Sequence, residues 1–246
     1  MTGSISLQEV LALLKGAPPE ALKEIDEAID QHLGHQLWVP NTGPQRMALE
    51  SKADQLLFGG MAGGGKSDLL IGLSSTVHYR SLLLRRLNKE VHFLVDRTEE
   101  ILGHSKGYNG QNNRWYLPND RLIMYGGCQH PGDERGYKGE PKDFLGVDEA
   151  SEFLEGQVQY LIQWLRTKRK DIKPRLVLAT NPPDRPEGEW VTRWFAPWVD
   201  KRHPMFPQPD GKLLWFENLA NGETRWSEEP FDIQTARGEY KPALTR

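Results

Sequence analysis

The segment from Gly60 to Ser67 constrains the fold of this chain more than any other feature of its sequence. It reads Gly60-Met-Ala-Gly-Gly-Gly-Lys66-Ser67 and matches the pattern G-x-x-x-x-G-K-[ST] at every position. A short apolar run precedes it and a helical pattern follows it, as a phosphate-binding loop requires. Glycines let the backbone curl so that its N–H groups face a phosphate, and the helix N-terminus adds a favourable dipole. The segment therefore predicts a nucleotide-binding α/β domain.

Two side chains of this loop have specific expected roles. Lys66 is expected to reach the β- and γ-phosphates, and the Ser67 hydroxyl is expected to coordinate Mg²⁺. The residues expected to contact the nucleotide here are Gly60, Met61, Ala62, Gly63, Gly64, Gly65, Lys66, Ser67 and Asp68.

A second motif lies downstream, at Phe144-Leu-Gly-Val-Asp148-Glu149. An apolar strand would deliver Asp148 to the metal at the carboxyl end of the sheet, where ligands of α/β proteins bind. Glu149 follows at once and is placed to polarise a water for attack on the γ-phosphate. On its own this pair would more often be a solvated strand end. Together with the complete loop it indicates hydrolysis of a triphosphate.

Two further positions are weaker candidates. The apolar run 176–179 ends in Thr180 and Asn181, whose short polar side chains suit the sensing of a γ-phosphate or of an attacking water. Taken in isolation, ordinary strand-end capping would be the better explanation for them. Gln45 precedes the first strand, and its amide has the donor and the acceptor needed to read adenine, although a surface role is more common for a lone glutamine.

The order of predicted elements defines the fold class. Strands are predicted at 55–59, 81–86, 121–125, 144–147 and 176–179, and helices at 67–79, 89–102 and 152–169. This alternation predicts a P-loop NTPase fold of the ASCE/RecA-like type, with a mainly parallel sheet flanked by helices. We expect a small helical N-terminal appendage at 1–36, an ATPase core at 37–202, and a proline-rich tail at 203–246 with a hairpin between 212–217 and 224–226.

Composition limits the partners and the compartment. The net charge is −3, so a nucleic acid would have to bind a local basic patch rather than a global positive field. Cys128 is the only cysteine, which rules out an intrachain disulfide and fits a reducing compartment. No signal peptide and no membrane-spanning stretch is visible, so we expect a cytosolic protein without a membrane partner.

Other classes of P-loop protein fit the sequence less well. GTPases need an N-K-x-D guanine reader, and Asn88-Lys89-Glu90-Val91 lacks its aspartate. The transporter signature L-S-G-G-Q is absent. A small-molecule kinase does not need an acid such as Glu149 directly after Asp148, which is the Walker B aspartate of this chain. The pattern therefore favours an ATPase that couples hydrolysis to motion.

The ordered set of motifs resembles the ATPase domain of the large terminase subunit, the DNA-packaging motor of tailed bacteriophages and herpesviruses. The likeness covers roughly residues 40–200. It is carried by Pro44-Gln45-Arg46, the loop from Gly59 to Ser67, Leu84-Arg85-Arg86, Val147-Asp148-Glu149-Ala150 and Ala179-Thr180-Asn181-Pro182, the last of which looks like the coupling motif of the family.

This resemblance implies that subunits form a ring and that each site is completed by a basic residue of its neighbour. In the family that residue precedes the Walker B aspartate and is often followed by glycine. Arg135-Gly136 and Lys138-Gly139 both qualify, and we favour Arg135 because a guanidinium is the better planar phosphate donor. Arg85 and Arg86 are candidates for a phosphate sensor in cis or for a structural ion pair.

The resemblance also implies the wider function. It implies an Mg-dependent ATPase that translocates double-stranded DNA into a procapsid, with the portal protein and the small terminase subunit as further partners. Such a protein would act in the cytoplasm of the infected host cell and transiently at the procapsid portal. The family's other half is a nuclease. Only about 65 residues follow the coupling motif, too few for such a domain, so we expect no nuclease activity from this chain.

Two alternatives remain open from the sequence. A helicase-type RecA-like ATPase shares an adenine-side glutamine and a polar motif after Walker B, but such helicases usually carry a second RecA-like domain in the same chain. A nucleotide-gated assembly module would bind ATP and scarcely turn it over.

Overall fold

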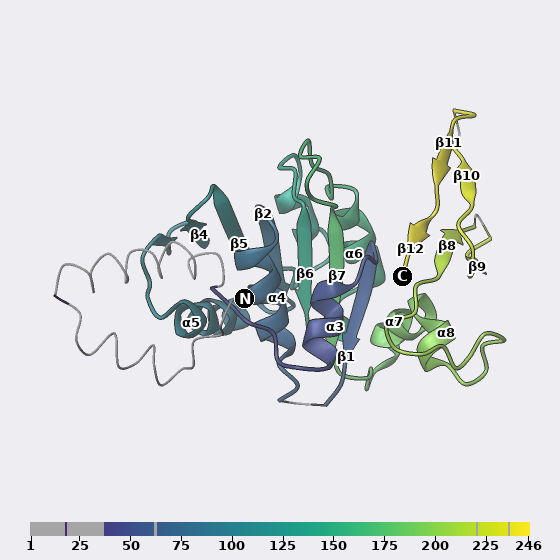
Figure 1. Ribbon diagram of the computed structural model, residues 1–246, viewed down its shortest axis with the longest axis horizontal. Helices are drawn as coiled ribbons and strands as arrows, with labels where there is room; N and C mark the ends of the chain where they lie inside the picture. Colours follow the sequence, from purple (N-terminus) through teal and green to yellow (C-terminus); the bar gives the residue numbers. More distant parts are fainter. Residues whose placement is uncertain (1–17, 19–36, 62, 220, 236) are drawn as a thin grey trace, which may run out of the picture. The chain divides into compact units, whose positions relative to one another are not determined.

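A seven-stranded sheet organises the part of the chain that the computed structural model describes, which is Pro18 and residues 37–246 without Ala62, Ala220 and Ala236. The strand order is β1-β7-β6-β2-β5-β4-β3. The first five strands are parallel, and β4 and β3 add an antiparallel edge. Their bounds are β1 Gln55–Gly59, β2 Arg80–Arg85, β3 Tyr108–Asn109, β4 Arg114–Leu117, β5 Arg121–Gly127, β6 Phe144–Asp148 and β7 Arg175–Thr180. The predicted α/β fold with a mainly parallel sheet is confirmed (Figure 1).

Helices connect these strands and cover the sheet (Figure 1). The α-helices are α3 Pro44–Glu50, α4 Lys66–Thr76, α5 Val91–Leu102, α6 Glu155–Ile162, α7 Glu189–Trp194 and α8 Ala196–Val199. Short 3₁₀ turns are η1 Asn88–Glu90, η2 Asp133–Tyr137, η3 Ala150–Glu152 and η4 Pro186–Gly188. The predicted N-terminal helical appendage at 1–36 lies outside the described residues, apart from Pro18.

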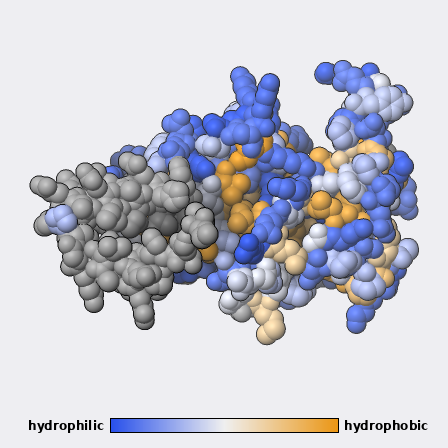
Figure 2. All heavy atoms as spheres, in the orientation of Figure 1, coloured by the Kyte–Doolittle hydropathy of each residue, from blue (hydrophilic) through white to orange (hydrophobic). Residues whose placement is uncertain are grey.

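The core consists of two apolar clusters, one on each face of the sheet. Because side chains alternate along a strand, β2 contributes Leu83 to one cluster and Leu82 and Leu84 to the other. The first cluster buries residues of α4 and α5, and the second buries residues of α6 and α7. This two-sided burial explains why the central strands are continuous apolar runs. On the face shown in Figure 2 the surface is mostly hydrophilic, with hydrophobic residues gathered in a few patches.

The sheet also fixes where polar residues meet. Strand β7 lies between β1 and β6, and Gly59 is in register with Thr180 while Asp148 is in register with Ala179. Strand β2 lies on the other side of β6, with Leu84 in register with Val147. The carboxyl ends of β1, β7, β6 and β2 therefore lie along one edge of the sheet, which is where parallel sheets place ligand sites.

The local structure differs from the prediction at three places. The helix expected at 152–169 ends at Ile162, because the chain turns there and Arg166 N–H bonds the carbonyl of Lys142 at 2.8 Å. Strands β3 and β4 were not predicted, since Tyr108–Asn109 and Arg114–Leu117 are very short. Helix α3, which begins at Pro44, was not predicted either.

The C-terminal segment packs through its last residues. The predicted hairpin is present as β8 Trp215–Asn218 and β9 Thr224–Ser227, and β12 Leu244–Thr245 pairs with β8. Strands β10 Asp232–Gln234 and β11 Tyr240–Pro242 form a second hairpin. The buried guanidinium of Arg246 donates to Gln55 Oε1 at 2.8 Å and to Trp194 O at 2.7 Å, and burial lowers its pKa to about 9. None of the helices described here is long and apolar enough to cross a membrane.

Two helical glycines allow a matched test of how Trp38 packs against α4. A Cβ at Gly72 in α4 would lie 2.0 Å from the ring of Trp38, whereas a Cβ at Gly156 in α6 meets nothing within 4 Å. We expect Gly72→Ala to lower the free energy of unfolding by about 1–3 kcal/mol, because the clash outweighs the helical gain of alanine. Gly156→Ala should instead raise it by up to about 1 kcal/mol. Urea denaturation of both variants measures the difference, and equal stability of the two would contradict the predicted contact.

Candidate functional site

Lys66 lies at the start of α4 and folds back across the loop that precedes it. Its ammonium donates to the carbonyls of Gly60 at 3.0 Å and Met61 at 2.9 Å. The third donor goes to Oδ1 of Asn181 at 2.8 Å, at the end of the neighbouring strand β7. Lys66 therefore joins the loop to the segment in which the sequence predicted a coupling residue. Ala62, in the same loop, lies outside the described residues.

The curvature of the loop depends on glycine. Gly60, Gly63 and Gly65 have φ values of 145°, 83° and 69°, a region that side-chain-bearing residues rarely adopt. Gly65 is the N-cap of α4. A Cβ at Gly65 would also lie 2.2 Å from Nε2 of Gln45, so both the backbone conformation and the close approach require glycine.

Gln45 is buried and braces this loop. Its Nε2 donates to the carbonyl of Gly65 at 2.8 Å, and its Oε1 accepts the N–H of Asn41 at 2.8 Å. Both ends of the amide are thus bonded within the chain. In this arrangement Gln45 supports the loop, and reading adenine would require it to exchange one of these bonds.

Ser67 and Asp148 bring two oxygens together where a metal was predicted. The Ser67 hydroxyl donates to Oδ2 of Asp148 at 3.0 Å, and the Asp148 side chain is buried. Mg²⁺ typically takes one or two protein oxygens and completes its shell with water and phosphate, so this pair fits it. Among residues 37–246, with the three gaps noted above, no group of three or more His, Cys, Asp or Glu is arranged to hold a metal ion.

Arg85 bonds the two acids at the end of β6, an arrangement that we call the Arg85 clamp. Its Nε donates to Oδ2 of Asp148 at 3.1 Å, and its Nη2 donates to Oε1 of Glu149 at 2.9 Å. The Arg85 side chain is only 15% exposed, so solvent screens this pair less than a surface ion pair. Arg85 therefore holds the predicted metal ligand and the predicted base in a fixed relation to each other.

Glu149 has two features of a reactive group. Its backbone is left-handed, with φ of 54°, which is strained for a residue that carries a Cβ. Burial raises the pKa of its carboxyl group, Asp148 raises it further, and Arg85 opposes both effects. A carboxylate with a raised pKa is a better proton acceptor near neutral pH than an ordinary surface glutamate.

The end of β7 is connected to both motifs. The buried Thr180 hydroxyl accepts the N–H of Ser151 at 3.2 Å and donates to the Ser151 hydroxyl at 2.8 Å. Asn181, the next residue, bonds Lys66. The strand end thus contacts the phosphate loop through Asn181 and the turn after Glu149 through Thr180.

The structure keeps three predicted basic residues away from this cluster. Arg86 points from the end of β2 to the carbonyl of Cys128 and to Oε1 of Gln157. Arg135 lies in η2 and Lys138 follows it; both are exposed, and their side chains bond no residue that the structure describes. Neither candidate finger therefore reaches the site of its own chain.

Asp68 has a partner that sequence reasoning missed. Arg97 of α5 donates to both carboxylate oxygens of Asp68, at 2.7 and 2.8 Å, and its Nη1 also bonds Glu100. The ion pair fixes an acid that directly follows Ser67 in the first turn of α4. A basic residue on the predicted helix 89–102 was the only sequence signal, and nothing in the sequence shows that α5 packs beside α4.

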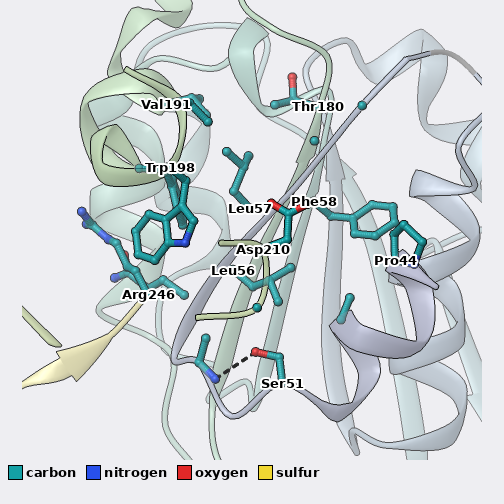
Figure 3. Close-up of a pocket in the computed structure, with 18 of the residues that line it drawn as sticks. Pro44, Ser51, Leu56, Leu57, Phe58, Thr180, Val191, Trp198, Asp210 and Arg246 are labelled. Atoms are coloured by element: carbon teal, nitrogen blue, oxygen red, sulfur yellow. Dashed lines mark hydrogen bonds between the residues drawn. The ribbon is translucent and has the colours of Figure 1, made fainter. Parts of the chain in front are cut away.

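A cavity of about 580 Å³ adjoins the site without containing it. It follows the outer edge of β1 and reaches Gly60 and Asn181. Leu56 and Leu57 of β1 line it, and Figure 3 shows Trp198 and Arg246 to one side of them. Lys66, Ser67, Asp148 and Glu149 do not line it, so the chemistry described above belongs to the sheet edge and not to this cavity.

Solved structures similar to this chain include large terminases of bacteriophages. The large terminase of bacteriophage HK97 aligns with a TM-score of 0.47 and 10% identity, over 62% of this chain and 34% of its own. A large terminase from a thermophilic bacteriophage aligns with a TM-score of 0.43 and 12% identity, over 62% and 38%. The large terminase ATPase domain of a Thermus phage aligns with a TM-score of 0.40 and 14% identity, over 62% and 69%.

This chain thus spans little more than a third of the first two terminases. No family model matches the sequence, and no curated protein matches it.

The Asp68–Arg97 pair gives the first test of the site. If the loop binds a triphosphate, Arg97→Ala leaves an uncompensated carboxylate beside it and should weaken ATP binding about three- to tenfold through repulsion. Asp68→Asn in the same chain should restore the affinity, because it removes the repelling charge. Titration with a fluorescent ATP analogue measures both. Arg46→Ala, which breaks the exposed pair with Glu50, is the matched control. If Arg97→Ala binds ATP as tightly as Arg46→Ala, Arg97 does not act by offsetting the charge of Asp68.

Proposed function

We propose that this chain is the ATP-hydrolysing motor domain of a viral large terminase. One observation carries the enzymatic part of this proposal. The carboxyl ends of four adjacent strands bring together the Lys66 loop, Asn181, the Asp148–Glu149 pair and Arg85, each bonded to another member of the group. The order of motifs along the chain supports the terminase assignment.

In the proposed reaction each side chain has one task. The loop N–H groups and Lys66 hold the β- and γ-phosphates, and Ser67 and Asp148 hold Mg²⁺, which when bound offsets the phosphate charge. Glu149 accepts the proton of the attacking water, and its raised pKa suits that role. Arg85 holds the carboxylates of Asp148 and Glu149 through one hydrogen bond to each.

Coupling follows from the bond between Lys66 and Asn181. All three donors of the Lys66 ammonium are in use, so a phosphate that binds Lys66 must displace one of its acceptors. We propose that Asn181 is the acceptor released, because the two carbonyls belong to the same loop as Lys66. The release would report the presence of a γ-phosphate to the segment after β7.

The assembly is part of the same proposal. A ring of subunits would place Arg135, or Lys138, against the γ-phosphate of the next subunit, and the exposure of both side chains supports such a role. Double-stranded DNA, the portal protein and the small terminase subunit are the proposed partners. The proposed setting is the cytoplasm of the infected host cell and, transiently, the procapsid portal.

Glu149→Gln tests the hydrolytic role. It preserves size but removes the proton acceptor, so we expect ATP turnover to fall at least about 100-fold while ATP binding is retained. Phosphate release and equilibrium binding of a fluorescent ATP analogue measure the two effects. Glu152→Gln, which changes an exposed acid three residues further on, should leave turnover unchanged. Full turnover by Glu149→Gln would rule out the proposed base.

The shared site predicts a dependence on assembly. Turnover per subunit should rise with protein concentration, and Arg135→Ala should lower it at least about 100-fold, within the range of arginine fingers. Mixing Arg135→Ala with Glu149→Gln should restore activity, since the second variant still presents its finger. Lys138→Ala provides the comparison. If Lys138→Ala rather than Arg135→Ala is inactive by itself and is rescued by Glu149→Gln, Lys138 is the finger. Turnover independent of concentration, without rescue of either, would contradict the shared site.

A further inference from the structure

Two adjacent arginines stand at the end of strand β2, Arg85 as its last residue and Arg86 directly after it, and the proposed reaction uses only the first. Arg85 bonds the acids of its own site. Arg86 donates to Oε1 of Gln157 at 2.5 Å and to the carbonyl of Cys128. The second arginine therefore connects the site to the segment from Cys128 to Lys138, which we call the finger loop because it carries both candidate trans residues.

Gln157 is the centre of this connection. It is buried in α6, the helix that follows the Walker B segment, and its Oε1 also accepts the N–H of Leu154. Its Nε2 donates to the carbonyl of His130 at 2.9 Å and lies 3.4 Å from Oε2 of Glu134. A buried glutamine whose amide bonds this many partners is suited to holding one backbone arrangement.

The finger loop is also fixed from within. The N–H of His130 donates to Asp133 at 2.8 Å, and that of Gly132 donates to Glu134 at 2.8 Å. At the far end the Tyr137 hydroxyl donates to the carbonyl of Gly127 at 2.9 Å. The backbone of the loop is thus anchored on both sides of Arg135, while the side chain of Arg135 stays exposed.

We propose that Arg86 and Gln157 are positioning residues that fix the finger loop for the active site of the neighbouring subunit. This inference rests on the proposed function. It assigns a separate task to each of the two arginines: Arg85 orients the acids of its own site, and Arg86 orients the basic residue offered to the next site. Because Arg86 directly follows Arg85, the last residue of β2, a shift of that strand end would alter both sites together.

The proposal separates two kinds of defect. A Gln157→Ala subunit keeps Lys66, Ser67, Asp148 and Glu149, so its own site remains able to hydrolyse ATP. What it loses is the support of the loop that it presents to its neighbour. A neighbour with a sound loop should therefore restore its activity, which no neighbour could do if Gln157 were needed only within its own site.

The experiment measures turnover of variants alone and in equimolar mixtures, at a concentration where the wild type is assembled. Gln157→Ala alone should lose at least about tenfold in turnover with unchanged ATP affinity. Mixed with Glu149→Gln, it should recover several-fold over the sum of the two, as Arg135→Ala or Lys138→Ala does. Mixed with the finger variant, which is whichever of Arg135→Ala and Lys138→Ala is inactive, Gln157→Ala should not recover. In that mixture neither subunit presents a working finger. Gln159→Ala, an exposed change on the same helix, should match the wild type.

Three results would overturn the inference. Wild-type turnover by Gln157→Ala, or failure of Glu149→Gln to rescue it while rescuing the finger variant, would exclude a positioning role. Failure to rescue any finger variant would remove the shared site and this inference with it. If Gln157→Ala does not fold by circular dichroism, Gln157→Glu replaces it, because glutamate still accepts from Arg86 but cannot donate to His130. The same rescue, from a smaller loss, is then expected.

Discussion

The ion pairs of Arg85 are the interaction on which the candidate site depends. Asp148 and Glu149 are adjacent acids at the end of a buried strand, and without a nearby cation their charges would repel each other and favour protonation. Arg85 bonds one oxygen of each, from the next strand of the sheet. That position is available only because β2 lies beside β6 in parallel. The topology of the sheet thus creates the electrostatic conditions in which a metal ligand and a base can stand side by side.

The same topology separates the phosphate loop from the acids by one strand, and this separation has a consequence. Since β7 lies between β1 and β6, its end contacts both motifs, through Asn181 to Lys66 and through Thr180 to Ser151. The proposed coupling uses these two contacts, because a ligand that displaces either one would act on the end of β7. Thr180 and Asn181 were ambiguous as sequence positions, because strand-end capping accounts for such residues. Their contacts give a physical reason to regard them as a connection between the phosphate loop and the turn after Glu149.

The sequence predicted the elements that have strong local signals and missed those set by distant contacts. The glycine-rich loop, the buried strands and the Asp148–Glu149 pair follow from residue pattern and spacing alone. The Arg85 clamp and the Asp68–Arg97 pair do not, because they join segments whose proximity depends on strand order. The predicted helix at 152–169 was longer than α6, because its apolar pattern continues beyond Ile162. In the structure Leu165 instead forms a β-bridge with Lys142, a contact that the local pattern does not reveal. Gln45 was read as a possible adenine contact, and only the packing of α3 shows that it braces the loop.

Arg85 and Arg86, at the end of β2, bear on how the subunits of a ring could act one after another. A finger loop that moved independently of its own site would supply its neighbour regardless of nucleotide state. Here the loop is anchored to Arg86 and to Gln157, and both anchors belong to elements that carry the site: β2 ends at the Arg85 clamp, and α6 begins six residues after Glu149. Any change that alters the ion pairs of Arg85 therefore acts on the strand end and on the start of the helix that support the loop. Communication between subunits would then need no separate relay, because one strand end serves both sites.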